Sequence, residues 1–140
     1  MNRKIIRHGF VLILLALITG FLIPATEIPR LGLSAHTIGI LSGALLIAIG
    51  AVWPLFNLGS GQSASMYWCW VYSSYANWLG CLVGAFTGAG RMTPISSAGR
   101  EAGDAAEIVV AVLLVSVAIT ALVGASLAIW GLCEVPRKDA

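Results

Sequence analysis

The hydrophobic residues of the chain fall into four long stretches that are separated by short polar segments. The stretches cover about residues 8–23, 35–53, 66–90 and 105–133. Because about 20 apolar residues are enough for a helix to cross the hydrocarbon core of a bilayer, each stretch is long enough or nearly so. An exposed strand edge is not tolerated in hydrocarbon, and no alternating barrel pattern occurs. The pattern predicts an all-α membrane protein, a single domain over residues 1–140, with four transmembrane helices running up-down-up-down.

Composition and charge narrow the class of protein further. Of the 140 residues, 59% are apolar and only 10% are charged, and the mean hydropathy is +0.93. A soluble domain has roughly a quarter of its residues charged, whereas here no charged residue occurs between Arg30 and Arg91. These values exclude a soluble globular domain and a disordered chain. They also exclude a nucleic-acid binder, which needs a basic surface. We therefore expect the protein to lie in the lipid bilayer and to bind no nucleic acid.

Positive charges and aromatic residues predict the orientation in the membrane. With four helices, both termini lie on one side, and that side carries more positive charge, which favours cytoplasmic termini. The terminus side holds Arg3, Lys4, Arg7, Arg137 and Lys138, and the other side holds Arg30, Arg91 and Arg100. Aromatic residues expected at the interface of the terminus side are Trp53, Tyr67, Trp68, Trp70 and Trp130.

A histidine and several glycines share one face of the predicted second helix. His36, Gly39, Gly43 and Gly50 occur at helical spacing. One interpretation is close packing between helices; the other is that the missing side chains leave room for a planar macrocycle bound by the imidazole. An ionisable residue in an uncharged apolar segment needs a partner or a function, so His36 is the better ligand candidate. We interpret the second histidine, His8, as a polar residue at the membrane interface.

The third stretch carries the most polar and aromatic residues. Asn77 lies about 16 Å along the helix from Met66, near the bilayer midplane. A buried amide costs free energy unless it is hydrogen-bonded. Asn77 therefore either joins helices or contacts a substrate, with Tyr72, Tyr75 and Trp78 around it as the apolar wall of a site for a small aromatic molecule.

Charged and sulfur-containing residues give weaker signals. Arg91 and Glu107 flank the predicted spans; they are solvated, orient the polar edge of a ligand, or pair with each other. The three cysteines, which form no CxxC pair, are interpreted as small packing residues. No GxSxG, HExxH, Walker or Rossmann motif occurs.

Several short segments resemble the hydroxylaminobenzene mutases, small bacterial membrane proteins that convert hydroxylaminoarenes into ortho-aminophenols. The segments are residues 7–10 (RHGF), 35–36 (AH) with Gly39 and Gly43, 53–54 (WP), 75–78 (YANW) and 88–95 (GAGRMTPI). The start of the chain and His36 also resemble the styrene oxide isomerases, a more distant family of four-helix membrane trimers that hold haem b between subunits.

The resemblance implies a reaction, a cofactor and an assembly. We expect an intramolecular transfer of the hydroxyl group of a small aromatic hydroxylamine from nitrogen to the ortho carbon, in the bacterial inner membrane, by a homo-oligomer, most simply a homotrimer. His36 aligns with the haem ligand of the isomerases, which implies haem b at His36 with Gly39 and Gly43 beside it. Ferric iron would then act as a Lewis acid.

The remaining site residues receive roles consistent with that reaction. We expect Asn77, Tyr75 and Arg91 to take part in catalysis, with the Asn77 amide hydrogen-bonded to the substrate nitrogen. Tyr72 and Trp78 are expected to contact the substrate ring, and stacking of Tyr75 and Trp78 would stabilise a cationic ring by about 0.5–2 kcal/mol.

Two alternatives remain open from the sequence. One is a haem-dependent epoxide isomerase of the styrene oxide type. Ser42 and Cys81 argue against it, since they align with an active-site asparagine and a tyrosine of the isomerases. The other alternative is a small membrane packing subunit without enzymatic activity, in which Asn77 and the glycines only join helices.

Overall fold

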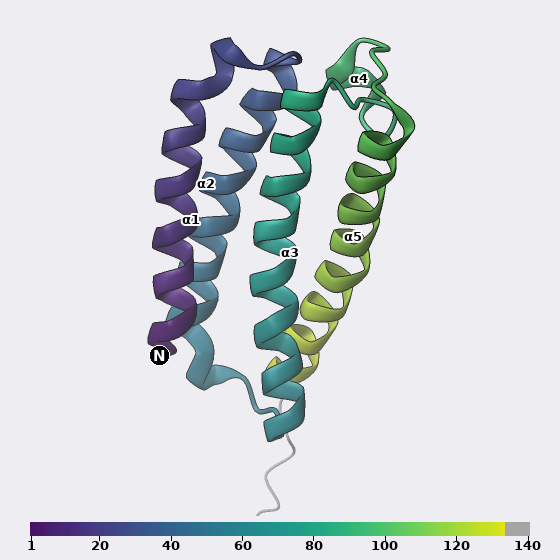
Figure 1. The fold of residues 1–140 in the computed structure, drawn as a ribbon. Coiled ribbons are helices and arrows are strands. Elements are labelled where there is room, and N and C mark those ends of the chain that lie inside the picture. Colours follow the sequence, from purple (N-terminus) through teal and green to yellow (C-terminus); the bar gives the residue numbers. More distant parts are fainter. Residues whose placement is uncertain (134–140) are drawn as a thin grey trace, which may run out of the picture.

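Four long helices, joined by short turns, make up the described part of the chain. The computed structural model describes residues 1–133, and this part contains helices and loops but no strand (Figure 1). The long helices are α1 (Arg3–Leu22), α2 (Pro29–Val52), α3 (Ser60–Thr87) and α5 (Asp104–Leu132), and the short elements are η1 (Ile23–Ala25), η2 (Trp53–Leu55) and α4 (Pro94–Ser97). Successive long helices run in opposite directions, so α5 ends where α1 begins. The charges predicted for the terminus side at Arg137 and Lys138 lie outside the described residues.

Three of the long helices, α1, α2 and α3, begin five or six residues before the apolar stretches that predicted them, and α5 begins one residue before. At the start of α1, the Asn2 side chain accepts hydrogen bonds from the backbone N–H groups of Lys4 (3.1 Å) and Ile5 (3.4 Å). Such a cap sets the first residue of a helix, whereas hydropathy marks only its apolar part. The end of α3 also differs from the prediction. The helix ends at Thr87 rather than near residue 90, because Gly88 has a left-handed backbone (φ 76°).

Three of the long helices are long and apolar enough to cross a membrane. These segments are Arg3–Ala25, Pro29–Leu55 and Asp104–Leu132, with hydropathies of 2.2, 2.1 and 2.8. The helix α3 does not reach this level, because polar residues interrupt it along its length. Large apolar side chains cover the outside, for example Phe21 (87% exposed), Leu122 (69%) and Ile129 (69%). Water would be a poor solvent for this surface, so the protein is a membrane protein.

Helices α1 and α2 approach each other closely at glycine residues. A Cβ atom at Gly43 would lie 2.6 Å from Ile13 Cγ1 and 2.7 Å from the Gly9 carbonyl oxygen, and one at Gly39 would lie 2.6 Å from Ala16 Cβ. Only glycine permits these distances, because any side chain would push the helices apart. The glycine-bearing face of α2 is therefore covered by α1.

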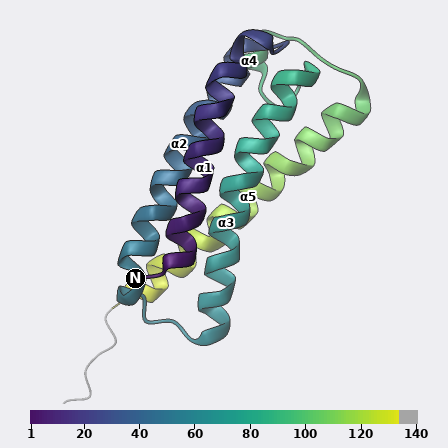
Figure 2. The same ribbon diagram turned by 60° about the vertical axis from the view of Figure 1, so that its left-hand side comes forward.

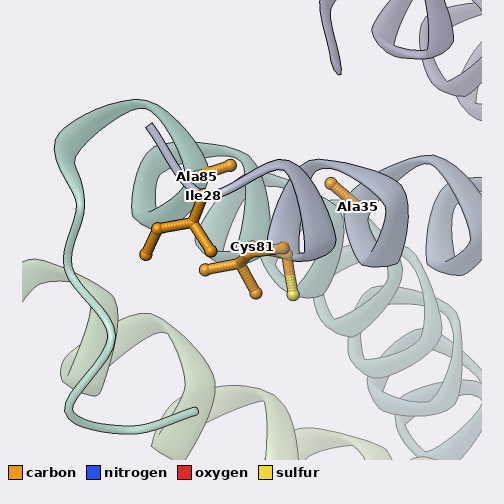
Figure 3. Packing of buried hydrophobic residues seen from close by; sticks show 5 residues of the cluster. Ile28, Ala35, Cys81 and Ala85 are labelled. Atoms are coloured by element: carbon orange, nitrogen blue, oxygen red, sulfur yellow. The ribbon is translucent and has the colours of Figure 1, made fainter. Parts of the chain in front are cut away.

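At the α4 end of the molecule, α2 is joined to α3 by small and aliphatic side chains. Ile28, Leu31, Ala35, Cys81 and Ala85 form this cluster, and each is at most 4% exposed (Figure 3). The Ile28 N–H also donates to the Ala85 carbonyl oxygen (3.0 Å). Cys81 is thus a packing residue, as the sequence predicted.

The last long helix, α5, packs mainly against α3, which it crosses at an angle (Figure 2). It makes few contacts with α1 or α2, and the Asn57 N–H of the α2–α3 loop donates to its Gly131 carbonyl oxygen (2.7 Å). Its contact is close at Gly124, where an added Cβ would lie 3.3 Å from the Trp70 ring. Because α3 also packs on α2, it lies between the α1–α2 pair and α5.

Substitution of Gly43 by alanine should destabilise the fold. The new methyl group would clash with Ile13 and the Gly9 backbone, and overpacking of this kind costs about 1–3 kcal/mol. We expect the midpoint of thermal unfolding of the purified protein in detergent, followed by tryptophan fluorescence, to fall by several degrees.

Gly61→Ala is the matched control, since nothing lies within 4 Å of a Cβ added there. Alanine favours helix more than glycine does, so this variant should unfold at the same temperature as the wild type or higher. Equal losses for the two variants would contradict the assigned α1–α2 contact.

Candidate active site

Helix α3 separates its polar and aromatic side chains onto two faces. Residues 70, 73, 74 and 77 follow helical spacing on one face and line a pocket toward α2 and α5. Residues 68, 72, 75 and 79 follow the same spacing on another face and line a groove toward α1 and α5. The prediction that Tyr72, Tyr75 and Trp78 surround Asn77 is therefore wrong. Asn77 lies on the other face of the helix.

The pocket on the Asn77 side, here called the polar pocket, has a volume of about 160 Å³. It is lined by Ser42 and Leu45 of α2, Trp70, Ser73, Ser74 and Asn77 of α3, and Val117 and Ala121 of α5. Ser73 and Ser74 are buried, and the Ser73 hydroxyl donates to the Trp70 carbonyl oxygen (3.3 Å). The Trp70 Nε1–H is buried without a hydrogen-bond partner among residues 1–133. A buried donor left unpaired costs about 1–3 kcal/mol, and this one lies against Gly124 of α5, where an added Cβ would be 3.3 Å from Nε1.

The groove on the opposite side, here called the aromatic groove, has a volume of about 410 Å³ and is open to the outside. Its lining residues are His8, Trp68, Val71, Tyr72, Tyr75, Ala76, Trp78, Leu79 and Leu113. It brings together the three aromatic residues that were predicted around the substrate.

The polar atoms of those three aromatic residues are already paired within the protein. The Tyr75 hydroxyl donates to the His8 carbonyl oxygen (3.2 Å) and lies 3.3 Å from His8 Nδ1. The Tyr72 hydroxyl bonds with the Ser116 hydroxyl (2.7 Å), and the Trp78 Nε1–H donates to Thr19 Oγ1 (3.1 Å). These bonds tie α3 to its neighbours, so the side chains offer mainly ring surface to the groove.

His36 lies apart from both cavities, between α2 and α1. Its Nδ1 is 2.7 Å from the Ala16 carbonyl oxygen. A carbonyl oxygen only accepts, so Nδ1 carries the proton and Nε2 keeps its lone pair. Gly20 leaves room for the ring, since a Cβ there would lie 3.0 Å from Nδ1. Metal-binding histidines usually have their second nitrogen held by such a carbonyl, so His36 has the tautomer and the support that a ligand needs.

The two glycines predicted beside the cofactor, Gly39 and Gly43, do not border open space. Both lie against α1, and a Cβ at Gly39 would also lie 2.9 Å from Trp78 Cδ1. Of the two interpretations of the glycine face, close helix packing is the one that the structure shows within the chain.

Glu107 fixes the loop that carries Arg91 near the α4 end. This carboxylate is only 3% exposed, and it accepts N–H bonds from Gly90 (3.1 Å), Arg91 (3.1 Å) and Ala102 (3.0 Å). Arg91 and Glu107 thus pair through the Arg91 backbone.

The Arg91 guanidinium turns outward instead, and it lines neither the polar pocket nor the aromatic groove. It lies 3.3 Å from Glu101 and 3.5 Å from Asp104, and its side chain is 54% exposed. The hydrogen bond that the guanidinium donates to Glu101 raises the pKa of Arg91 above its ordinary value, so the side chain stays charged.

Three residues of α3 that line the polar pocket were not predicted from the sequence as site residues. Trp70 was assigned to the interface belt, and Ser73 and Ser74 received no role. Their spacing with Asn77, at positions i, i+3, i+4 and i+7, was the available signal, because it describes one polar face of a helix.

The described residues thus form an all-helical membrane protein with a small polar pocket between α2, α3 and α5. The sequence model of the styrene oxide isomerase family matches residues 1–133. The chain is 42% identical to hydroxylaminobenzene mutase HabB of Ectopseudomonas oleovorans over 97% of its length and 84% of that protein. It is 38% identical to hydroxylaminobenzene mutase HabA of the same organism over 83% of the chain and 87% of that relative. No solved structure matches the chain.

The chain belongs to the styrene oxide isomerase family, and it is an enzyme, an isomerase of the mutase type. A packing subunit without activity is therefore no longer an alternative.

Removal of the Glu107 carboxylate should loosen the loop over residues 88–103. Glu107→Ala leaves three N–H groups without their acceptor, which should destabilise the protein by about 2 kcal/mol or more. We expect a lower unfolding midpoint and faster proteolytic cleavage within the loop. Glu101→Ala is the control, because it removes only an exposed ion pair, which contributes at most about 1 kcal/mol. Similar losses in both variants would contradict the assigned role of Glu107.

Proposed function

We propose that the protein converts hydroxylaminobenzene-type arenes into 2-aminophenols. The N–O bond breaks, a C–O bond forms at the ortho carbon, that carbon loses its proton and the nitrogen gains one, so there is no net oxidation. The observation that carries this proposal is the 42% identity to hydroxylaminobenzene mutase HabB over nearly the whole chain.

The substrate occupies the polar pocket in this proposal. An engineered cavity of about 150 Å³ is known to bind benzene, and the polar pocket has about 160 Å³, which suits one ring with a small substituent. The Trp70 ring, Leu45 and Val117 supply apolar surface. The role proposed for the Trp70 Nε1–H, which is buried without a partner among residues 1–133, is to donate to the hydroxylamine oxygen.

Asn77 then holds the nitrogen end of the substrate. Its amide lines the same pocket as Trp70 and Ser42, so it can hydrogen-bond the nitrogen while Trp70 bonds the oxygen. Burial among three helices limits the access of water, which favours return of the same hydroxyl group to the ring over hydration. Tyr75 and Arg91 take no part in the proposed reaction. The Tyr75 hydroxyl is hydrogen-bonded to His8, and Arg91 lies in the loop near α4.

His36 is the residue that would hold haem b. Its Nδ1–H is held by the Ala16 carbonyl oxygen and Gly20 leaves space for the ring, so the donor fits the group. When bound, the ferric haem supplies a Lewis acid that polarises oxygen. His36 does not line the polar pocket of its own chain, so the participation of both in one reaction requires a second copy of the protein.

We propose further that α3 crosses the inner membrane with the other three long helices and that the termini are cytoplasmic. Its 28 residues span roughly 42 Å, and it connects two helices that are apolar enough to cross. Arg3, Lys4 and Arg7 lie at the terminus end, which agrees with the positive-inside rule. Assembly as a homotrimer is proposed from the resemblance to the isomerases alone.

Product analysis tests the reaction directly. Membranes containing the protein should convert hydroxylaminobenzene into 2-aminophenol. The family match also favours a second candidate reaction, isomerisation of styrene oxide to phenylacetaldehyde. Formation of the aldehyde without any 2-aminophenol would overturn the proposal.

Variants on the two faces of α3 locate the reaction. Asn77→Ala should lower kcat by at least tenfold with little effect on the unfolding midpoint, because it removes one contact to the substrate. Tyr72→Phe loses only the bond to Ser116 and should keep most of the activity. A larger loss of activity in Tyr72→Phe than in Asn77→Ala would place the reaction in the aromatic groove instead.

A separate pair of variants tests the haem. His36→Ala should lose the Soret absorbance, the bound iron and the activity together, while His8→Ala should retain haem. Active wild-type protein that contains no iron would refute the role of His36.

A further inference from the structure

A second groove, which the proposed reaction does not use, lies at the end of the molecule where α1 begins. This basal groove has a volume of about 510 Å³. It is lined by Asn2, Lys4, Trp53, Ser63, Ala64, Tyr67 and Trp68. Tyr67 makes edge-to-face contacts with Trp53 (ring centroids 6.5 Å apart) and Trp68 (5.1 Å). Tryptophan and tyrosine concentrate at the depth of lipid headgroups, so the basal groove lies at the level of the membrane interface.

The charge at this end is positive and unpaired in the described residues. Lys4 is the charged residue that lines the basal groove. Within residues 1–133, Arg3, Lys4 and Arg7 form no ion pair, and the acidic residues lie near the α4 end: Glu27, Glu101, Asp104 and Glu107. An exposed ammonium at the interface attracts the phosphate of an anionic lipid.

The basal groove and the aromatic groove border each other at Trp68, which lines both. From Trp68 to Leu79 the aromatic groove follows α3 for about 16 Å at 1.5 Å per residue. One leaflet contributes about half of the 30 Å hydrocarbon core, so this length matches one leaflet.

The aromatic groove also has the chemistry that an acyl chain requires. The polar atoms of Tyr72, Tyr75 and Trp78 are bonded to Ser116, His8 and Thr19. What remains toward the groove is hydrocarbon surface, on which an acyl chain packs without leaving a polar group unpaired.

We propose that one anionic phospholipid binds along this surface, with its phosphate at Lys4 in the basal groove and one acyl chain in the aromatic groove. The pairing of a cation at the interface with an apolar groove of one leaflet's length matches the amphipathic shape of a phospholipid. A helix from a second copy fits less well, because it would cover the Lys4 ammonium. The described residues contain no acidic side chain at this end that could neutralise the ammonium.

Native mass spectrometry of the full-length protein tests the proposal. The protein is reconstituted in nanodiscs of phosphatidylcholine mixed with phosphatidylglycerol and then released in mild detergent. We expect one phosphatidylglycerol retained per subunit in preference to phosphatidylcholine. Lys4→Gln should weaken this retention about fivefold, whereas the matched variant Arg30→Gln, near the α4 end, should leave it unchanged.

Two further experiments distinguish the binding of the acyl chain from the binding of the phosphate. Leu79→Trp narrows the acyl groove and should lower the retention of phosphatidylglycerol without any change of charge. Inorganic phosphate alone, without an acyl chain, should not raise the unfolding midpoint of the delipidated protein. Equal retention of both lipids, or equal effects of Lys4→Gln and Arg30→Gln, would overturn the proposal. It would also be overturned by disulfide formation between subunits from Trp68→Cys, which would assign the groove to a second copy.

Discussion

The fold depends on the need of the polar side chains of α3 to find partners inside the protein. Hydrocarbon offers no hydrogen bonds, so serine, asparagine and the indole N–H cannot face lipid without a large cost. Helix α3 therefore lies between the α1–α2 pair and α5, and its polar face turns toward α2 and α5. The same arrangement places the polar pocket between α2, α3 and α5, so the residues that are least compatible with lipid line it.

The flanking helices meet the same constraint in a different way. Their few hydroxyl side chains return hydrogen bonds to carbonyl oxygens of the preceding turn. Examples are Thr19 to Leu15 (2.9 Å), Thr37 to Leu33 (2.8 Å) and Thr120 to Ser116 (2.8 Å). A helix can carry hydroxyl groups through an apolar medium in this manner. Helix α3 has more polar groups than its own backbone satisfies, and the polar atoms of Tyr72, Tyr75 and Trp78 bond to neighbouring helices.

Hydropathy was sufficient to locate the four long helices, because burial in an apolar medium is what it measures. It missed the first turns, which depend on caps such as Asn2, and it extended α3 past Gly88. The candidate site was less accessible. The sequence left open whether Asn77 joins helices or contacts a substrate, and which residues share its face depends on the rotation of α3 relative to α2 and α5. His36 needed a carbonyl partner, and Ala16 supplies it from another helix, a pairing that no local sequence pattern encodes.

The central claim is that the hydroxyl group stays within the polar pocket while it moves from nitrogen to carbon. Hydroxylaminobenzene labelled with heavy oxygen, incubated with the protein in ordinary water, tests this claim most directly. The account predicts that mass spectrometry finds the label retained in 2-aminophenol. Replacement of the label by oxygen from water would contradict it, because the pocket would then admit solvent during the reaction.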